Sequence, residues 1–319
     1  MKKIYFVSII LIFFSCEKEE LAISPHTPGN VEIQQIELGQ DYILQIFYDL
    51  GTKSSIYQNT KTDWDIAFES SNNGYHIILN SSTFSALSYI ENLTFSDTIS
   101  TTNLNWSWDN PNGKLDSTAF GDYRELTGFF IIDRGYNING NKRGYKKIMI
   151  DSVTSEYYKI TYANLDNSEY NSLEIYKDPA VNFTSFSFTQ NNIVNIQPPS
   201  DDWDLVFSQY THLFNNPDIP AYLVTGVISN YQVLIAEDTS YNFEEITYNM
   251  INNLSFSSNC DIIGYDWKEY NLETGSFSIN SNINYVIKDR QQRYFKLRFI
   301  DFYNELGEKG YPKFELQEL

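Results

Sequence analysis

The sequence is short of the residues that hold metal ions, form disulfides or bind nucleic acids. Three His and two Cys among 319 residues exclude a multi-zinc design and a disulfide-stapled fold. Lys and Arg number 22 against 41 Asp and Glu, a net charge of −19. Such a surface repels phosphate backbones, so we expect no nucleic-acid partner.

Aromatic side chains, by contrast, are abundant. The 25 Tyr and 22 Phe dominate an aromatic content of 16%, and aromatic rings fit the pleated, half-buried surface of a sheet. The chain is long enough for one large or two medium domains with a sizeable core. The composition therefore predicts a globular, strand-rich protein.

The N-terminus carries an export signal. Lys2 and Lys3 precede an apolar run from Ile4 to Phe14, which at about 1.5 Å per residue cannot cross a hydrocarbon core of about 30 Å. We therefore expect a signal peptide at 1–15. The end of the run looks like a bacterial lipobox with Cys16 as the lipid-bearing residue; an ordinary cleavage site beside a chance cysteine is the alternative.

The segment 16–31 is predicted to be the lipidated cysteine and a tether. Its start, Glu17–Glu20, resembles the acidic, Lys-containing tag that sends many Bacteroidota lipoproteins to the outer face of the outer membrane. Each buried CH₂ of an acyl chain contributes about 0.8 kcal/mol, so several chains on Cys16 hold the membrane well. We expect a cell-surface lipoprotein of the outer membrane.

The chain contains an internal echo. Thr62–Phe68 returns as Asp201–Phe207, 139 residues later. In both copies Trp, Ile or Leu, and Phe alternate with Asp and Ala or Val, which predicts a half-buried strand with Trp and Phe on one face. A second echo in the same order favours a duplicated β unit, expected at 32–195 and 196–319. It relates Phe130–Arg134 and Gly144–Ile148 to Tyr285–Asp289 and Arg293–Leu297.

One stretch has helical spacing. Its apolar residues fall on one stripe between Phe243 and Leu254, which predicts a short helix packed on a sheet. Alternation predicts further strands at Phe183–Phe188, Tyr222–Ile228 and Tyr294–Phe299. The expected fold class is mostly β, with duplicated antiparallel β-sheet or sandwich units and one or two short helices.

These residues resemble the HmuY family, the haem-capturing surface lipoproteins of Bacteroidota. The resemblance runs from about residue 60 to the end, is stronger in 196–319, and implies an all-β lipoprotein that passes haem to an outer-membrane transporter. It also implies two axial His or Met ligands, at positions that differ among members. The matching pieces are the two Trp-Asp-x-x-Phe strands, Tyr222–Val227, Ile263–Lys268 and the run from Tyr285 to Pro312.

Four side chains are candidate iron ligands. His212 is the strongest, because we expect it in a polar-aromatic loop after the second Trp-Asp strand, and functional residues favour loops on a rigid scaffold. His76 lies in a strand-like run. Either histidine could instead be a satisfied surface or core imidazole. The thioethers of Met149 and Met250 complete the set, with Met250 also suited to the core.

Arg134 and Arg143 are candidate propionate ligands. They flank the long polar turn of the first copy, although a solvated hairpin tip needs no such role. Abundant tyrosines are available to line a porphyrin slot.

Catalytic motifs are missing. The sequence has no Gly-x-Ser-x-Gly, no phosphate-binding glycine loop and no His-Glu-x-x-His, so we expect no enzyme. The resulting hypothesis is a haem-binding surface lipoprotein for iron acquisition. The alternatives are a β scaffold that binds glycan or protein, and a structural surface component.

Overall fold

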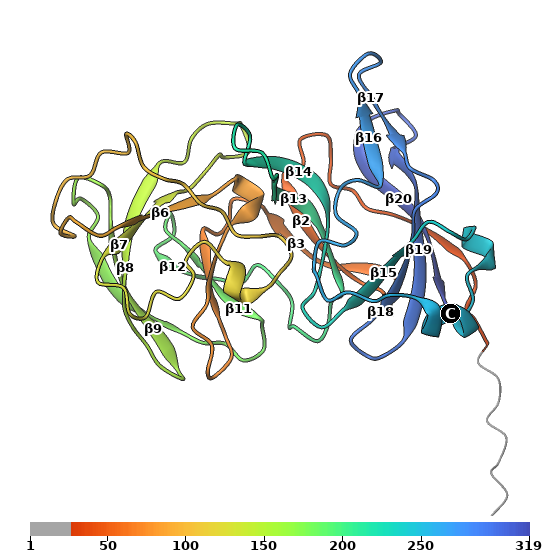
Figure 1. The fold of residues 1–319 in the computed structure, drawn as a ribbon, viewed down its shortest axis with the longest axis horizontal. Helices are drawn as coiled ribbons and strands as arrows, with labels where there is room; N and C mark the ends of the chain where they lie inside the picture. Colours follow the sequence, from red (N-terminus) through yellow and green to blue (C-terminus); the bar gives the residue numbers. More distant parts are fainter. Residues whose placement is uncertain (1–26) are drawn as a thin grey trace, which may run out of the picture.

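The structure is a computed structural model that describes residues 27–319. Strands make up 43% of the chain and helices 5%, which confirms the mostly β prediction. All strand pairs are antiparallel. Four sheets follow one another along the long axis of the molecule and form two sandwiches (Figure 1).

The first sandwich packs its two sheets around a core that includes Phe68, Phe130 and Phe186. Its outer sheet has the order β10-β9-β8-β7-β6 and its inner sheet the order β12-β11-β4-β5. The strands are β4 (Ile66–Glu69), β5 (Ile77–Leu79), β6 (Ala86–Ile90), β7 (Phe129–Asp133), β8 (Tyr145–Val153), β9 (Tyr157–Ala163), β10 (Asn171–Tyr176), β11 (Phe183–Ser187) and β12 (Asn192–Val194).

The second sandwich has a core that includes Phe207, Phe299 and Phe314. Its inner sheet has the order β14-β13-β2-β3, its outer sheet the order β1-β20-β19-β18-β15, and a small ribbon joins β16 to β17. The strands are β1 (Glu32–Gln35), β2 (Leu44–Asp49), β3 (Ser54–Thr60), β13 (Leu205–Leu213), β14 (Ala221–Ser229), β15 (Leu234–Asp238), β16 (Lys268–Asn271), β17 (Ser276–Ile279), β18 (Asn284–Lys288), β19 (Tyr294–Tyr303) and β20 (Lys309–Glu318).

The predicted helix after Phe243 is two separate 3₁₀ turns. The ammonium of Lys296 on β19 donates to the carbonyls of Phe243 (2.6 Å) and Ile246 (2.9 Å), which a continuous α-helix would use for its own backbone bonds. The 3₁₀ helices of the described part are η1 (Ser81–Thr83), η2 (Leu115–Ser117), η3 (Phe243–Glu245) and η4 (Tyr248–Asn253).

Each copy of the repeated Trp-Asp strand pairs with the hairpin that precedes the other copy. The β2–β3 hairpin precedes the first Trp-Asp strand, β4, but β2 pairs with the second, β13. The β11–β12 hairpin precedes β13, but β11 pairs with β4. The predicted unit 32–195 thus contributes β1, β2 and β3 to the second sandwich. The boundary at residue 195 stays a prediction.

The duplication extends to hydrogen bonds that the repeat pattern alone does not reveal. Asn80 donates from Nδ2 to the carbonyls of Trp64 (2.8 Å) and Lys61 (2.7 Å). Asn230 donates in the same way to Trp203 (2.8 Å) and Ser200 (2.9 Å). In each copy this buried amide fixes the turn that leads into the Trp-Asp strand.

The predicted orientation of the two tryptophans is wrong. Ile66 and Phe68 enter the first core, whereas Trp64 precedes the strand and packs with Ala67 on the opposite face. Trp203 likewise shares a cavity lining with Val206. Both tryptophans therefore lie between the two sandwiches rather than inside either core.

Candidate functional site

His212 lies on strand β13, where it pairs with Tyr222 of β14. The prediction that it occupies a loop is wrong, because the ladder continues to Leu213 before the chain turns. Side chains at every second position share a face, so His212 lies on the same face as Ser208 and Tyr210. Those two residues line a cavity between the inner sheets.

The His212 ring is surrounded by aromatic side chains. Its centroid lies 4.9 Å from the ring of Phe214 and 4.9 Å from that of Tyr265, both edge-on. Its buried Nδ1 has no hydrogen-bond partner among the described residues. Burial raises the pKa of the nearby Asp261 carboxyl, and the imidazole opposes that rise. Contacts with these two rings therefore position the half-buried imidazole.

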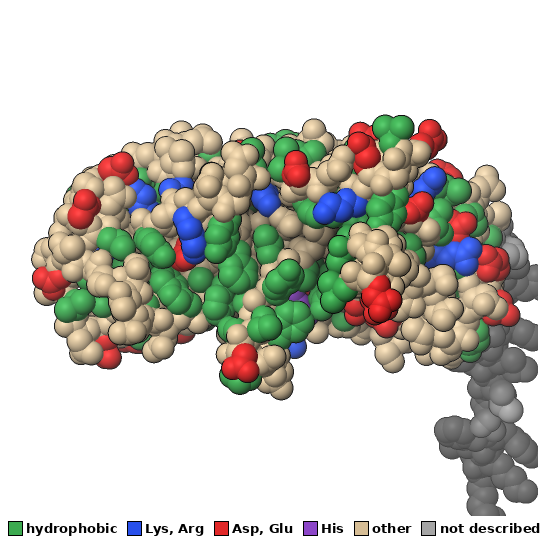
Figure 2. All heavy atoms as spheres, turned by 90° about the horizontal axis from the view of Figure 1, so that it is seen from above, with side chains coloured by type: hydrophobic (Ala, Val, Ile, Leu, Met, Phe, Trp, Pro, Cys, Tyr) green, Lys and Arg blue, Asp and Glu red, His purple; other side chains and the backbone are tan. Residues whose placement is uncertain are grey.

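Aromatic surface continues around this histidine. Tyr222, directly across the ladder, is 61% exposed and Phe214 is 39% exposed. Hydrophobic side chains reach the surface in a broad band across the middle of one face of the molecule (Figure 2). Exposed apolar patches of this kind mark binding surfaces on soluble proteins.

His76 is held differently. Its Nδ1 lies 2.5 Å from Oε2 of Glu69, and its ring stacks on Tyr75 at 4.0 Å. Burial raises the pKa of Glu69, but hydrogen bonds from Ser71 and His76 outweigh it and bring the pKa below its usual value. A carboxylate on one ring nitrogen is also how metal-binding histidines are oriented, although it serves equally well as a structural ion pair.

The two methionines lie on different elements. Met149 on β8 packs beside Phe129 and Ile131 in a small satellite core. Met250 lies in η4, where its backbone N–H donates to the carbonyl of Thr247. No contact joins either thioether to His76 or His212 in the described residues, so their role as ligands stays a prediction.

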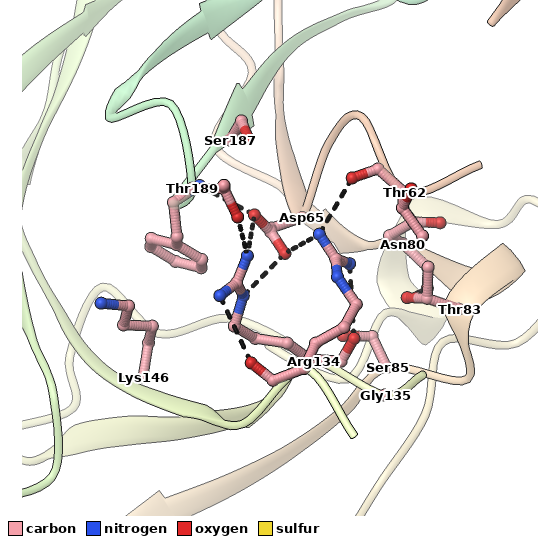
Figure 3. Close-up of polar contacts among 12 residues, drawn as sticks. Thr62, Asp65, Asn80, Thr83, Ser85, Arg134, Gly135, Lys146, Ser187 and Thr189 are labelled. Atoms are coloured by element: carbon pink, nitrogen blue, oxygen red, sulfur yellow. Dashed lines mark hydrogen bonds and ion pairs between the residues drawn. The ribbon is translucent and has the colours of Figure 1, made fainter. Parts of the chain in front are cut away.

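Arg134 and Arg143 do come together on the carboxylate of Asp65, which Figure 3 shows beside Arg134. Arg134 binds the fully buried Asp65 with Nε (2.9 Å) and Nη2 (3.1 Å). Arg143 reaches the same carboxylate at 2.9 Å. Arg134 also donates to Thr189 and Arg143 to Thr62. The cluster thus joins β4 to the turn between β7 and β8.

Two guanidiniums share the carboxylate of Asp65 here, and the nearby carboxylate of Asp63 also interacts with Arg143. Both arginines line an open hollow of about 360 Å³ together with Thr62 and Thr189. Their predicted role as propionate ligands stays a prediction. Neither predicted histidine ligand lines this hollow.

The enclosed cavity between the inner sheets has a volume of about 180 Å³. Sites for drug-sized ligands typically measure about 300–1,000 Å³, so this cavity is small for a porphyrin. His76, His212, Met149 and Met250 lie outside its lining. Cys260 does line it; burial raises the pKa of this thiol to about 12, which makes it a poor nucleophile.

Two predictions concern parts of the chain that the structure does not describe. Cys16 and the signal peptide 1–15 lie outside residues 27–319.

Within the described residues no helix is long and apolar enough to span a bilayer. The same part of the chain contains no group of three or more His, Cys, Asp or Glu side chains placed to hold a metal ion.

Comparisons with known proteins place the chain in a family. The family model described as HmuY protein matches residues 41–316, and no curated protein sequence matches significantly. Crystal structures of apo PinO from Porphyromonas gingivitis and the apo HmuY analog TFO from Tannerella forsythia are similar at 8% and 11% identity, with TM-scores of 0.27 and 0.26. Each match covers 91% of this chain, and 97% of PinO and 95% of TFO. At these scores the assignment depends on the family match, which spans most of the chain: the protein is a member of the HmuY family.

Proposed function

We propose that this HmuY-family chain binds haem on the face around His212, with the imidazole as an axial iron ligand. Family membership supports haem as the cargo. The observation that carries the choice of residue is the His212 ring, whose buried Nδ1 has no hydrogen-bond partner among residues 27–319 and which lies between aromatic side chains. Iron binding would therefore not have to break a hydrogen bond between this Nδ1 and a described side chain, and aromatic rings suit the flat porphyrin face.

His76 is the less suitable of the two histidines. Its Nδ1 already pairs with Glu69, and one ring face is covered by Tyr75. Haem binding at His212 leaves that ion pair intact, so His76 serves as the control position.

The test is a titration of hemin into the purified protein, followed by its Soret absorption. The wild-type protein should saturate with a shifted Soret band. Losing an outer-shell partner of a metal ligand costs about 10–100-fold in affinity, so His212→Ala, which removes the ligand itself, should cost at least that much. His76→Ala should bind as the wild type does. If the wild-type protein leaves the Soret band of free hemin unchanged, haem binding is refuted. If only His76→Ala loses binding, the assignment of His212 as the ligand is refuted.

We also propose that the protein is a lipoprotein of the outer membrane, anchored through Cys16, that hands haem to a transporter for iron acquisition. The lipobox-like end of the apolar run and the acidic tag behind it support this address. Metabolic labelling with an alkyne fatty acid should mark the wild-type protein and leave Cys16→Ala unlabelled. Labelling of both would contradict the anchor.

For the transfer step, cells given hemin-loaded protein as their iron source should grow, and deleting the outer-membrane haem transporter should abolish that growth.

A further inference from the structure

The cavity between the two sandwiches contains buried polar atoms that nothing in the described chain satisfies. Its walls are mostly apolar and come from both inner sheets, including Phe47, Trp64 and Trp203. Four lining residues each have a buried side-chain atom without a hydrogen-bond partner among the described residues: Nε1 of Trp203, Oγ of Ser185, Oγ1 of Thr118 and Oγ of Ser229. Trp203 is 6% exposed and Ser185 3% exposed. An unmade hydrogen bond of a buried group is costly, so four such groups around one cavity point to an occupant.

The duplication shows what is missing at Trp203. In the first copy the Trp64 indole donates from Nε1 to Oε1 of Gln45 at 2.9 Å. The carbonyl of Tyr48 accepts a hydrogen bond from the N–H of Asp204, and the carbonyl of Phe186 accepts one from the N–H of Asp65. Tyr48 and Phe186 therefore occupy equivalent positions. Gln45 lies three residues before Tyr48, and Phe183 lies three residues before Phe186, so Gln45 and Phe183 correspond. The side chain of Phe183 has no hydrogen-bond acceptor to offer the Trp203 indole.

The cavity also has a cover, whose two ends are held together by Asp109. The segment 109–118 lies over it and contributes Pro111, Leu115 and Thr118 to its lining. Asp109, the acidic side chain of the lining, already accepts from the backbone N–H groups of Leu79 (2.6 Å) and Ala119 (2.7 Å). Because its carboxylate is engaged in this way and Lys114, the other charged residue of the lining, is exposed to solvent, the lining presents no buried free charge to an ion.

We propose that this cavity binds a small, uncharged, ring-sized molecule that carries a hydroxyl or carbonyl oxygen. The volume of about 180 Å³ compares with an apolar cavity of about 150 Å³ that accepts benzene in another protein. The Trp203 indole can only donate, so the ligand must supply an acceptor. The two hydroxyls of Ser185 and Thr118 add donors and acceptors on the same wall. This site is separate from the face around His212.

Phenol and benzene are matched probes, since they share the ring and only phenol has the oxygen. Each is titrated into ¹⁵N-labelled protein while the indole Nε1–H resonance of Trp203 is followed. One neutral hydrogen bond is worth roughly five- to tenfold in affinity, so phenol should bind that much more tightly than benzene. It should also shift the Trp203 resonance. Trp203→Phe should reduce phenol binding to the level of benzene and leave benzene unchanged.

Trp64→Phe is the control, because the Trp64 indole already has its acceptor and its removal should not lower the preference for phenol. Ala67→Leu fills the cavity from β4 and should abolish binding of both probes. If this variant does not fold, the two Trp→Phe variants still decide. The proposal is overturned if neither probe binds saturably, which means that the cavity holds water only. It is also overturned if phenol has no advantage over benzene.

Discussion

Asp65→Asn and Asp204→Asn change the same position in the two copies of the duplicated strand, and the structure predicts opposite effects on stability. Both side chains are buried, at 0% and 1% exposure. Both accept a backbone N–H, from Phe188 (2.8 Å) and Leu50 (2.9 Å) respectively. The copies differ in the cations that surround each carboxylate.

Asp65 is neutralised by Arg134 and Arg143, so its loss leaves two guanidiniums without their shared carboxylate. Removing one partner of a buried ion pair costs about 3–5 kcal/mol. Asp289 occupies the place of Arg134 in the second copy: its N–H donates to Arg293 just as that of Arg134 donates to Gly144. Asp204 therefore faces a second carboxylate where Asp65 faces a cation.

Burial raises the pKa of Asp204 from 3.8 to about 7, with Asp289 and Asp49 adding to the rise. Between pH 3.8 and about 7 the folded state binds more protons than the unfolded state, so the free energy of unfolding falls as pH rises through this window. Above pH 7 the full loss of stability is present. The full change corresponds to roughly 4 kcal/mol. Asp204→Asn should therefore stabilise the protein by up to that amount at pH 8, and by less than about 2 kcal/mol at pH 5.

Urea unfolding of both variants and the wild type at pH 8 and pH 5 measures these differences directly. We expect Asp65→Asn to lower the free energy of unfolding at both pH values. We expect Asp204→Asn to raise it, more at pH 8 than at pH 5. The same sign for both variants at pH 8 would refute the reasoning from the surrounding charges.

Three further predictions concern other buried groups. Burial lowers the pKa of Lys268 to about 7, so the unfolded state binds more protons between pH 7 and 10.5 and stability should rise with pH there; Lys268→Met should flatten that rise in urea midpoints, and an unaltered slope would contradict it. Asn80→Ala and Asn230→Ala each lose the two Nδ2 hydrogen bonds that fix the turn, together with bonds that their Oδ1 accepts, so each should cost at least about 2–3 kcal/mol in thermal unfolding; a loss in only one would show that the two motifs are not equivalent. Cys260 should resist iodoacetamide in the native protein and react after unfolding, by peptide mass mapping, because the thiol is buried and its pKa is raised to about 12; rapid native labelling would contradict its place in the cavity wall.

Much of the fold was predictable because local pattern and burial agree. The alternation over Tyr294–Phe299 predicts a strand, and β19 confirms it. The echo of Thr62–Phe68 in Asp201–Phe207 predicts two related strands, and β4 and β13 confirm both. The exchange of hairpins between the copies was beyond this reasoning, since alternation identifies a strand and does not name its neighbour.

The candidate site was less predictable, because contacts between distant residues decide it. No local signal pairs His76 with Glu69, seven positions away across a turn. The repeated strand includes Asp65, and the long turn is flanked by Arg134 and Arg143, but only the packed sheets show that all three side chains meet. His212 was placed in a loop because its polar, aromatic neighbours favour turns; the pairing with Tyr222 instead extends the strand.

The most direct test of the proposed function is a hemin titration of His212→Ala with and without free imidazole. If His212 binds the iron, the variant should bind hemin weakly, and added imidazole should restore a wild-type Soret spectrum by replacing the lost ligand. If His212→Ala binds hemin as tightly as the wild type and shows the same spectrum without imidazole, His212 is not the ligand and the account is contradicted.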